Sequence, residues 1–222
     1  MSRRIGNPVT WGLAVLVALL TVGAGTATAQ NVPNSWQLTA FGGGYFGGQI
    51  YEGQDGVVDV GTAPTYGARL GYNFNRAIGV EVGWSQAKPN LNLGSYYCCG
   101  TGNSGTIGTI TVNTYEADVL FSYGSRKASG YFAVGLGATS LSPQVAGVSM
   151  GNETRFTSNV GLGGIFSLGP QVALRVDGRW RFVDTENTTG AGGWCDYYYG
   201  CYYYTTTWYS SGEITGGLLV RF

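Results

Sequence analysis

The sequence predicts an all-β protein, an eight-stranded antiparallel up-and-down transmembrane β-barrel. Three observations predict it: segments of alternating apolar and polar residues, connections that are alternately short and long, and a low content of charge. Charged residues make up 11% of the 222 residues and aromatic residues 14%, and there are 39 glycines. Because an ordinary soluble domain carries about 25% charged residues, this composition favours a wall that faces lipid.

The first 29 residues are predicted to be a secretory signal peptide. Arg3 and Arg4 give a positive start, residues 11–24 are mostly apolar, and residues 27–29 supply a small-x-small cleavage pattern. The apolar stretch is shorter than the ~20 residues that a membrane-spanning helix needs, so a retained N-terminal anchor is the weaker interpretation. We therefore expect a leader over residues 1–29 and a single barrel domain over residues 30–222.

Eight alternating segments follow, most of them close to the ~9–11 residues that a tilted strand needs to cross a bilayer. In chain order they are residues 36–51, 65–75, 78–88, 113–124, 130–141, 154–168, 172–185 and 208–222. The connections after the second, fourth and sixth segments are short, and the other connections are long. Short turns on one side and long loops on the other are typical of outer-membrane barrels, whose long loops lie outside the cell.

Most segments have one apolar face, because successive side chains of a strand point to opposite sides. The seventh segment shows this most clearly, with an apolar face made of Val172, Leu174, Val176, Trp180 and Phe182. The second, third, fourth, sixth and eighth segments alternate in the same way, with apolar faces that begin at Tyr66, Ile78, Tyr115, Phe156 and Ile214. The first and fifth segments are too rich in glycine for their faces to be assigned.

The opposite faces carry charge, which predicts a lumen closed by ion pairs. A soluble sandwich or lipocalin-like barrel would instead place the apolar faces inside. Six basic and five acidic residues with glycines beside them suit a narrow lumen, since eight strands leave an interior that side chains can just fill. This predicted charge ladder comprises Arg69, Glu81, Glu116, Asp118, Arg155, Arg175, Asp177, Arg179, Arg181, Glu213 and Arg221. If these ion pairs are permanent, the lumen is closed to solutes. If they exchange partners, small ions could pass through the lumen, and the sequence leaves both possibilities open.

The last segment resembles the end of a known family of barrels. Its apolar residues alternate with polar or small ones up to Phe222, and residues 41–45 of the first segment are rich in glycine. Together with the leader, these features resemble the OmpA-like eight-stranded outer-membrane β-barrel family of Gram-negative bacteria. The resemblance implies an outer-membrane location, contact with outer-membrane lipids, and recognition of Phe222 by the barrel assembly machinery. Unlike the founding members, the chain has no periplasmic peptidoglycan-binding domain after the last strand, so we expect no cell-wall-anchoring role.

The sequence argues against an enzyme and against nucleic-acid binding. The chain has no histidine, and the enzymes among outer-membrane barrels resemble one another in relying on one. Glu116 and Asp118 share a face with residues of opposite charge, so ion pairing is favoured over acid–base work. Removing Arg3 and Arg4 with the leader leaves 10 basic against 12 acidic residues, a net charge of −2, which offers no basic patch. We expect no cofactor, no metal and no nucleic-acid partner.

Four cysteines lie in two of the long loops: Cys98, Cys99, Cys195 and Cys201. An oxidising compartment makes disulfides the expected state. Four cysteines allow three pairings. The favoured single bond is Cys195–Cys201, a bond between Cys98 and Cys99 would be strained, and two cross-links between the loops remain open. A four-thiolate metal site lacks the two-residue spacing of common zinc sites.

The last long loop is rich in aromatic residues, namely Trp194, Tyr197, Tyr198, Tyr199, Tyr202, Tyr203 and Tyr204. Tyrosine gives a large, rigid contact area, so the loop could bind an unidentified surface ligand. Packing among the tyrosines or at lipid headgroups is the favoured interpretation, because interfacial aromatic belts are common in membrane proteins. We therefore predict a small outer-membrane barrel with a structural or surface-interaction role. The alternatives are a narrow channel for small solutes or ions, and an adhesin acting through this loop.

Overall fold

The computed structural model describes residues 32–53, 56–93, 105–125, 127–145, 148–149, 151–184, 195–196, 200–201 and 208–222. Within these ranges, no helix is long and apolar enough to cross a membrane. The predicted signal peptide, residues 1–29, lies outside the described residues, so its assignment stays a prediction.

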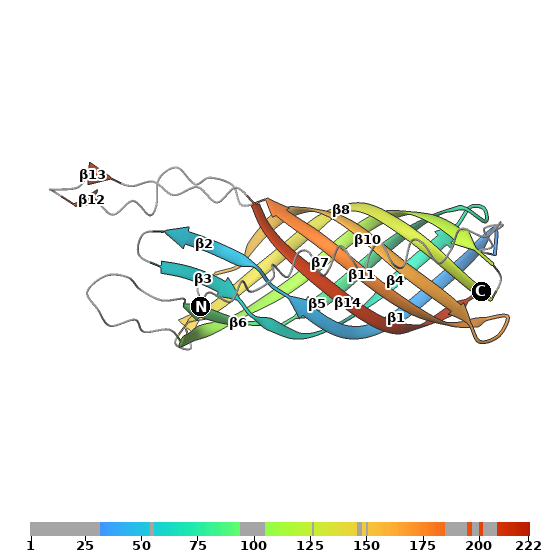
Figure 1. The fold of residues 1–222 in the computed structure, drawn as a ribbon, viewed down its shortest axis with the longest axis horizontal. Coiled ribbons are helices and arrows are strands. Elements are labelled where there is room, and N and C mark those ends of the chain that lie inside the picture. The colour runs from blue at the N-terminus through green and yellow to red at the C-terminus, as the bar shows by residue number, and fades with distance from the viewer. Residues whose placement is uncertain are drawn as a thin grey trace, which may run out of the picture.

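Eight long strands form a closed antiparallel barrel (Figure 1). In chain order they are β1 (Ser35–Phe46), β4 (Thr62–Asn73), β5 (Ile78–Ala87), β7 (Gly105–Gly124), β8 (Ala128–Val145), β10 (Glu153–Ser167), β11 (Val172–Asp184) and β14 (Trp208–Arg221). Each long strand pairs with the next along the chain, and β1 pairs with β14 to close the ring. The predicted eight-stranded up-and-down barrel is confirmed.

Short strands extend the barrel at the end opposite the three short turns (Figure 1). They are β2 (Gln49–Gly53), β3 (Gly56–Val60), β6 (Asn90–Leu93) and β9 (Val148–Ser149). A separate two-stranded sheet pairs β12 (Cys195–Asp196) with β13 (Gly200–Cys201). Apart from the first three residues of β2, which fall within the first predicted segment, these six strands belong to connections that the sequence alone left as loops, and they mark the outer end of the barrel.

Three long strands have one boundary that differs from the predicted one by four residues or more. The first ends at Phe46 instead of running to residue 51, because the chain bends at Gly47 and Gly48, where it passes close to other strands. A methyl group on Gly47 would lie 2.5 Å from the side chain of Val60, so only glycine fits there. β7 starts at residue 105 and β8 ends at residue 145, since residues 108–112 of β7 pair with residues 141–145 of β8 beyond the predicted ends, and the start of β7 pairs with β6.

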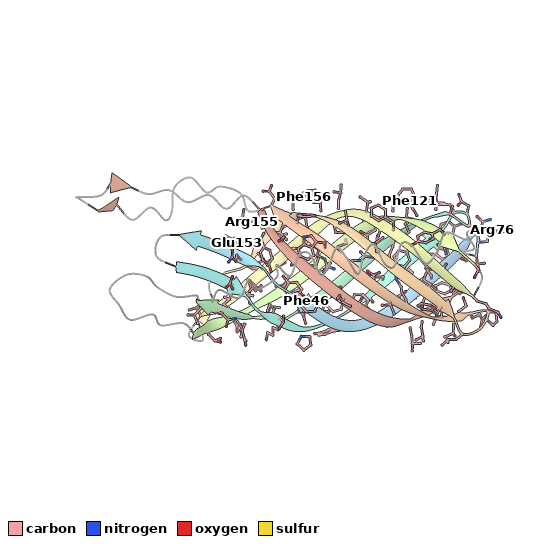
Figure 2. All side chains as sticks on the ribbon, in the orientation of Figure 1. Phe46, Arg76, Phe121, Glu153, Arg155 and Phe156 are labelled. Atoms are coloured by element: carbon pink, nitrogen blue, oxygen red, sulfur yellow. The ribbon has the colours of Figure 1, made fainter. Side chains whose placement is uncertain are left out.

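The apolar faces of the long strands point away from the lumen, as predicted. Figure 2 shows Phe121 and Phe156 projecting outward from the wall, and both side chains are exposed. Near the short-turn end the outward rings pack in a row, with ring centroids 5.0 Å apart for Trp36 and Tyr72 and 5.2 Å apart for Tyr72 and Phe74. Aromatic side chains at this level are typical of a membrane interface.

The interior of the barrel is layered. At the outer end a buried apolar cluster, here called the outer plug, consists of Tyr45, Val60, Ala87, Leu91, Ile110, Val112, Val183 and Tyr209. Toward the short-turn end a second apolar cluster consists of Leu120, Tyr131, Ala133, Ile165, Ala173 and Leu219. Between the two lies a group of buried charged residues. The core is therefore inside the barrel, but only its middle layer is ionic.

Candidate functional site

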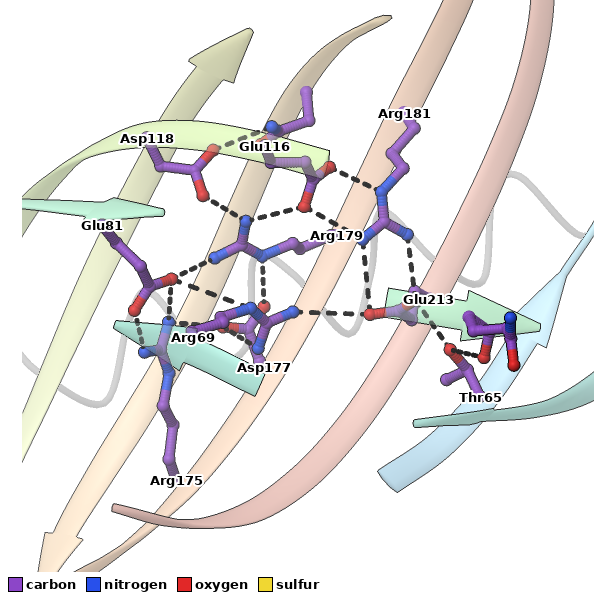
Figure 3. A network of polar contacts seen from close by, with 12 residues as sticks. Thr65, Arg69, Glu81, Glu116, Asp118, Arg175, Asp177, Arg179, Arg181 and Glu213 are labelled. Atoms are coloured by element: carbon purple, nitrogen blue, oxygen red, sulfur yellow. Dashed lines mark hydrogen bonds and ion pairs between the residues drawn. The ribbon is translucent and has the colours of Figure 1, made fainter. Parts of the chain in front are cut away.

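Nine charged side chains meet in the middle layer of the lumen (Figure 3). They come from five strands on different sides of the barrel wall, and each is at most 7% exposed. We call this group the ionic network; it consists of Arg69, Glu81, Glu116, Asp118, Arg175, Asp177, Arg179, Arg181 and Glu213. The four residues from β11 alternate with outward apolar residues, so the pattern that makes β11 amphipathic also points both signs of charge inward.

Arg179 lies at the centre of the ionic network. Its Nε donates to Asp177 Oδ1 at 3.0 Å, and its Nη2 donates to Glu81 Oε1 at 2.8 Å. Its Nη1 donates to Glu116 Oε2 at 3.1 Å and to Asp118 Oδ2. One guanidinium therefore joins four carboxylates from three strands, which ties β11 to β5 and β7 across the lumen.

Arg181 extends the ionic network toward β14. Its Nε donates to Glu116 Oε1 at 2.6 Å, and its Nη1 donates to Glu213 Oε2 at 3.0 Å. Each carboxylate also receives a bond from Nη2, at 3.1 Å for Glu116 and 3.4 Å for Glu213. Such two-pronged pairs fix the orientation of a guanidinium as well as its position.

Arg175 contacts two of the carboxylates that Arg179 also contacts, those of Glu81 and Asp177. Its Nη1 donates to Glu81 Oε2, and its Nη2 donates to Glu81 Oε1 at 3.1 Å and to Asp177 Oδ2 at 2.9 Å. Its Nε donates to the hydroxyl of Tyr131 at 2.7 Å, and that hydroxyl donates to Asp177 Oδ2. A neutral phenol thus completes the hydrogen bonding of this corner.

Arg69 is held more loosely than the other three arginines. Its nearest carboxylate oxygens lie 3.4 Å away on Glu213, 3.5 Å away on Asp177 and 3.7 Å away on Glu81. The guanidinium carbon stands 4.0 Å from the centroid of the Phe41 ring, so an aromatic face supplies part of its environment.

Inward glycines make room for these long side chains. A methyl group on Gly161 would lie 3.1 Å from Arg179 Cγ, and one on Gly83 would lie 3.1 Å from Arg69 Cγ. A methyl group on Gly135 would collide with Asp118 Oδ1. The ionic network and the neighbouring glycines therefore form one packed layer, which fits the narrow interior of an eight-stranded barrel.

Two residues of the predicted ladder lie elsewhere. Arg155 is half-buried toward the outer end, where its Nη2 donates to the exposed Glu153 at 3.0 Å (Figure 2). Arg221 lies near the short turns, and its Nη1 donates to Ser167 Oγ at 3.2 Å. Both residues occupy inward positions, but each is close to one end of its strand. The alternation of polar and apolar residues shows which face of a strand a side chain lies on, but not its height along the barrel axis. For this reason the sequence alone grouped Arg155 and Arg221 with the other charged residues of the ladder.

Sequence reasoning missed four neutral contributors to this layer: Phe41, Thr65, Tyr131 and Asn159. Thr65 donates to Glu213 Oε2 at 3.2 Å, and Asn159 Nδ2 donates to Asp118 Oδ1 at 2.8 Å. Phe41 and Tyr131 lie on β1 and β8, the glycine-rich strands whose faces could not be assigned. Tyr131 lies in register opposite Gly163, whose missing side chain leaves space for the phenol ring, but this pairing could not be predicted from the sequence.

Most residues of the predicted loop sites lie outside the described residues. These are Cys98, Cys99, Trp194, Tyr197, Tyr198, Tyr199, Tyr202, Tyr203 and Tyr204. In the β12–β13 register the backbone of Cys195 is directly opposite that of Cys201. Antiparallel partners have Cα atoms ~4.5–5.5 Å apart, within the range that a disulfide spans. The bond itself stays a prediction.

Phe222 continues the closing seam of the barrel. Its amide donates to the Trp36 carbonyl at 3.1 Å, and the Trp36 amide donates to the Phe222 carbonyl at 2.9 Å. Its ring points outward and is 68% exposed. Its recognition by assembly machinery stays a prediction. Among the described residues no group of histidine, cysteine, aspartate or glutamate side chains is arranged to hold a metal ion.

Comparison with known proteins places the chain in a family. Residues 14–222 match the model of the outer membrane protein beta-barrel domain. The chain belongs to this family. It is therefore an outer-membrane barrel of a bacterium, as the wall of apolar side chains and the aromatic row also indicate.

Several solved structures resemble this outer-membrane barrel, among them the following two. Neisserial surface protein A is 14% identical, with a TM-score of 0.54, and the match covers 89% of this chain and all of that one. The outer membrane protein OprG from Pseudomonas aeruginosa is 11% identical, with a TM-score of 0.54, and the match covers 86% of this chain and 96% of that one. At these identities the likeness shows the fold alone. No curated protein matches the chain.

Proposed function

We propose that this outer-membrane barrel is closed to solutes and serves as a rigid, non-catalytic support that holds its outer connections at the cell surface. The observation that carries the proposal is the filling of the lumen, by the ionic network at mid-height and by the outer plug above it. An ion crossing the barrel would have to displace both layers.

The ionic network supports closure because its charges hold one another in place. Each of its arginines contacts at least two carboxylates. Separating a buried pair leaves an uncompensated charge in a medium that solvates it poorly. Pairs of this kind exchange partners rarely unless water or another charge replaces the contact.

The outer plug supports closure by a different physical effect. Its members are apolar or aromatic, and it includes a hydrogen bond of 2.5 Å between the hydroxyls of Tyr45 and Tyr209. A hydrated ion that enters this layer loses its water without gaining charged partners. The two layers therefore oppose permeation independently.

A non-catalytic role is supported by the chemistry available. The chain contains no histidine, and the network carboxylates Glu81, Glu116 and Asp177 each accept bonds from at least two guanidiniums. For its partners we propose outer-membrane lipids along the apolar wall and the barrel assembly machinery at Phe222. A surface ligand bound by the aromatic loop remains a further proposal.

A narrow channel is the second candidate, and the loose seating of Arg69 favours it. This arginine lies at least 3.4 Å from every carboxylate oxygen that it contacts, so it loses least on moving aside. A shift of Arg69 would open space beside Phe41 without breaking the contacts of Arg179.

Conductance across planar bilayers distinguishes the two candidates. We expect the wild-type barrel to show no resolvable current at neutral pH, because both filled layers block the lumen. Arg69→Ala tests the loose position, and Arg155→Ala, which lies outside the ionic network, is the matched control. A steady open current through the wild type would contradict closure. Brief wild-type openings that become more frequent in Arg69→Ala but not in Arg155→Ala would establish the channel instead.

A further inference from the structure

The ionic network has one carboxylate more than it has guanidiniums. Its five acidic residues are Glu81, Glu116, Asp118, Asp177 and Glu213, and its four basic residues are Arg69, Arg175, Arg179 and Arg181. If every group were ionised, the buried layer would carry a net charge of −1. Arginine does not change its charge in proteins. An unbalanced buried charge is costly enough that a group usually neutralises instead.

Asp118 receives the least positive charge of the five carboxylates. Glu81 and Asp177 each contact three arginines, and Glu116 and Glu213 each contact two. Asp118 contacts only Arg179 within the described part of the chain, and Arg179 is shared with three other carboxylates.

The surroundings of Asp118 add negative rather than positive charge. Across the sheet it is the register partner of Glu81 on β5, and Glu116 lies two residues before it on the same face of β7. On β8 its register partner is Gly135, which brings no side chain and leaves no room for a methyl group, as described above. On β10 it faces the neutral amide of Asn159, and on β11 it faces Arg179.

Asn159 is the buried neutral side chain next to Asp118 that can accept a hydrogen from it. Its side chain is 2% exposed, and its Oδ1 is buried without a hydrogen-bond partner. The two ends of an asparagine amide are assigned from the surrounding network. If the amide is turned over, Oδ1 occupies the position 2.8 Å from Asp118 Oδ1 and can accept a hydrogen there. It accepts one only if that carboxyl group is protonated.

We propose that the ionic network binds one proton, held by Asp118 and donated to the amide oxygen of Asn159. With this proton the layer contains four positive and four negative charges. A proton fits this place better than a metal ion, because no described group of acidic side chains is arranged as a set of metal ligands. The inference goes beyond the proposed closure, since an open lumen with the same network would bind the same proton.

Because of this proton, the stability of the folded barrel should fall as the pH rises. In the unfolded chain Asp118 is ionised at neutral pH, so folding takes up one proton. The folding equilibrium constant then falls about tenfold for each unit of rising pH, for as long as the folded barrel retains the proton. Once the folded barrel also releases the proton, this dependence ends. Asp118→Asn carries a permanent neutral group there and removes the dependence.

Infrared spectroscopy of the folded barrel in lipid vesicles tests the proposal directly. At neutral pH the wild type should show the carbonyl stretch of one neutral carboxylic acid, shifted in deuterium oxide. The band should be absent in Asp118→Asn and retained in Asp184→Asn, which alters an aspartate at the outer end of β11. Asp118→Asn should fold as well as the wild type and lose the tenfold dependence on pH.

Four results would overturn the proposal. They are a wild-type spectrum without the band, a band that persists in Asp118→Asn, a variant that fails to fold because it needs the ionised carboxylate, and an Asp118→Asn variant with the wild-type dependence on pH. If the band is missing and sodium stabilises the wild type at constant ionic strength, the balancing charge is a metal cation.

Discussion

Replacing Arg179 by methionine should destabilise the barrel by about 3–5 kcal/mol, the cost of leaving a buried charge without its partner. Arg179 contacts the carboxylates of Glu81, Glu116, Asp118 and Asp177, so its loss leaves several negative charges without their shared partner. Methionine keeps most of the side-chain volume, which limits the contribution of an empty cavity. The measurement is the free energy of unfolding by denaturant in lipid vesicles.

The matched control is Arg155→Met. Arg155 is also an inward arginine of the predicted ladder, but it forms an ion pair with the exposed Glu153 near the outer end. An exposed pair contributes only about 0–1 kcal/mol, so this variant should unfold almost as the wild type does. Equal losses from Arg179→Met and Arg155→Met would show that the ionic network has no special part in stability.

Val176→Arg, which places a charge on the lipid-facing side of the wall, should lower the free energy of unfolding by about 2–4 kcal/mol. This is the penalty for a charge near the bilayer midplane. Val176 points outward between the inward residues Arg175 and Asp177 and is 50% exposed. The apolar face of β11 extends from Val172 to Phe182, so Val176 lies near its middle. Unfolding in vesicles measures the effect, with Val176→Ala as a reference for the lost packing.

Leu168→Arg is the control for depth in the membrane. Leu168 is equally apolar and more exposed, but it lies in the turn between β10 and β11 at the end of the barrel. Near the interface the cost falls to about 0–1 kcal/mol. If Val176→Arg were as harmless as Leu168→Arg, the outward face of β11 would not be in contact with the hydrocarbon core.

The faces of the strands could be predicted from sequence because alternation is a local property. In β11 the order of Arg175, Val176 and Asp177 is enough to place the charges on one side and the apolar residue on the other. The choice of inside for the charged face followed from the balance of signs and from glycines such as Gly135 and Gly161, which make room for long side chains.

The partners of each charge could not be predicted, because they depend on register and height across distant strands. Arg175 and Glu81, for example, are 94 residues apart in the chain. The same reason explains why Arg155 and Arg221 were placed in the ladder. Tyr131 was missed because glycine interrupts the alternation of β8, and the apolar outer plug was missed because part of it comes from short strands within predicted loops.

A double-mutant cycle between Arg181 and Glu213 tests most directly the claim that the lumen charges act as a paired network. Their side chains meet across β11 and β14, with Nη1 and Oε2 3.0 Å apart. We expect Arg181→Met and Glu213→Gln together to destabilise the barrel by less than the sum of the single effects, with a coupling of about 0.5–3 kcal/mol. The pairing of Arg181→Met with Glu153→Gln, two positions without a mutual contact, should show additive effects. Additive losses at Arg181 and Glu213 would contradict the account, because these charges would then be neighbours without being partners.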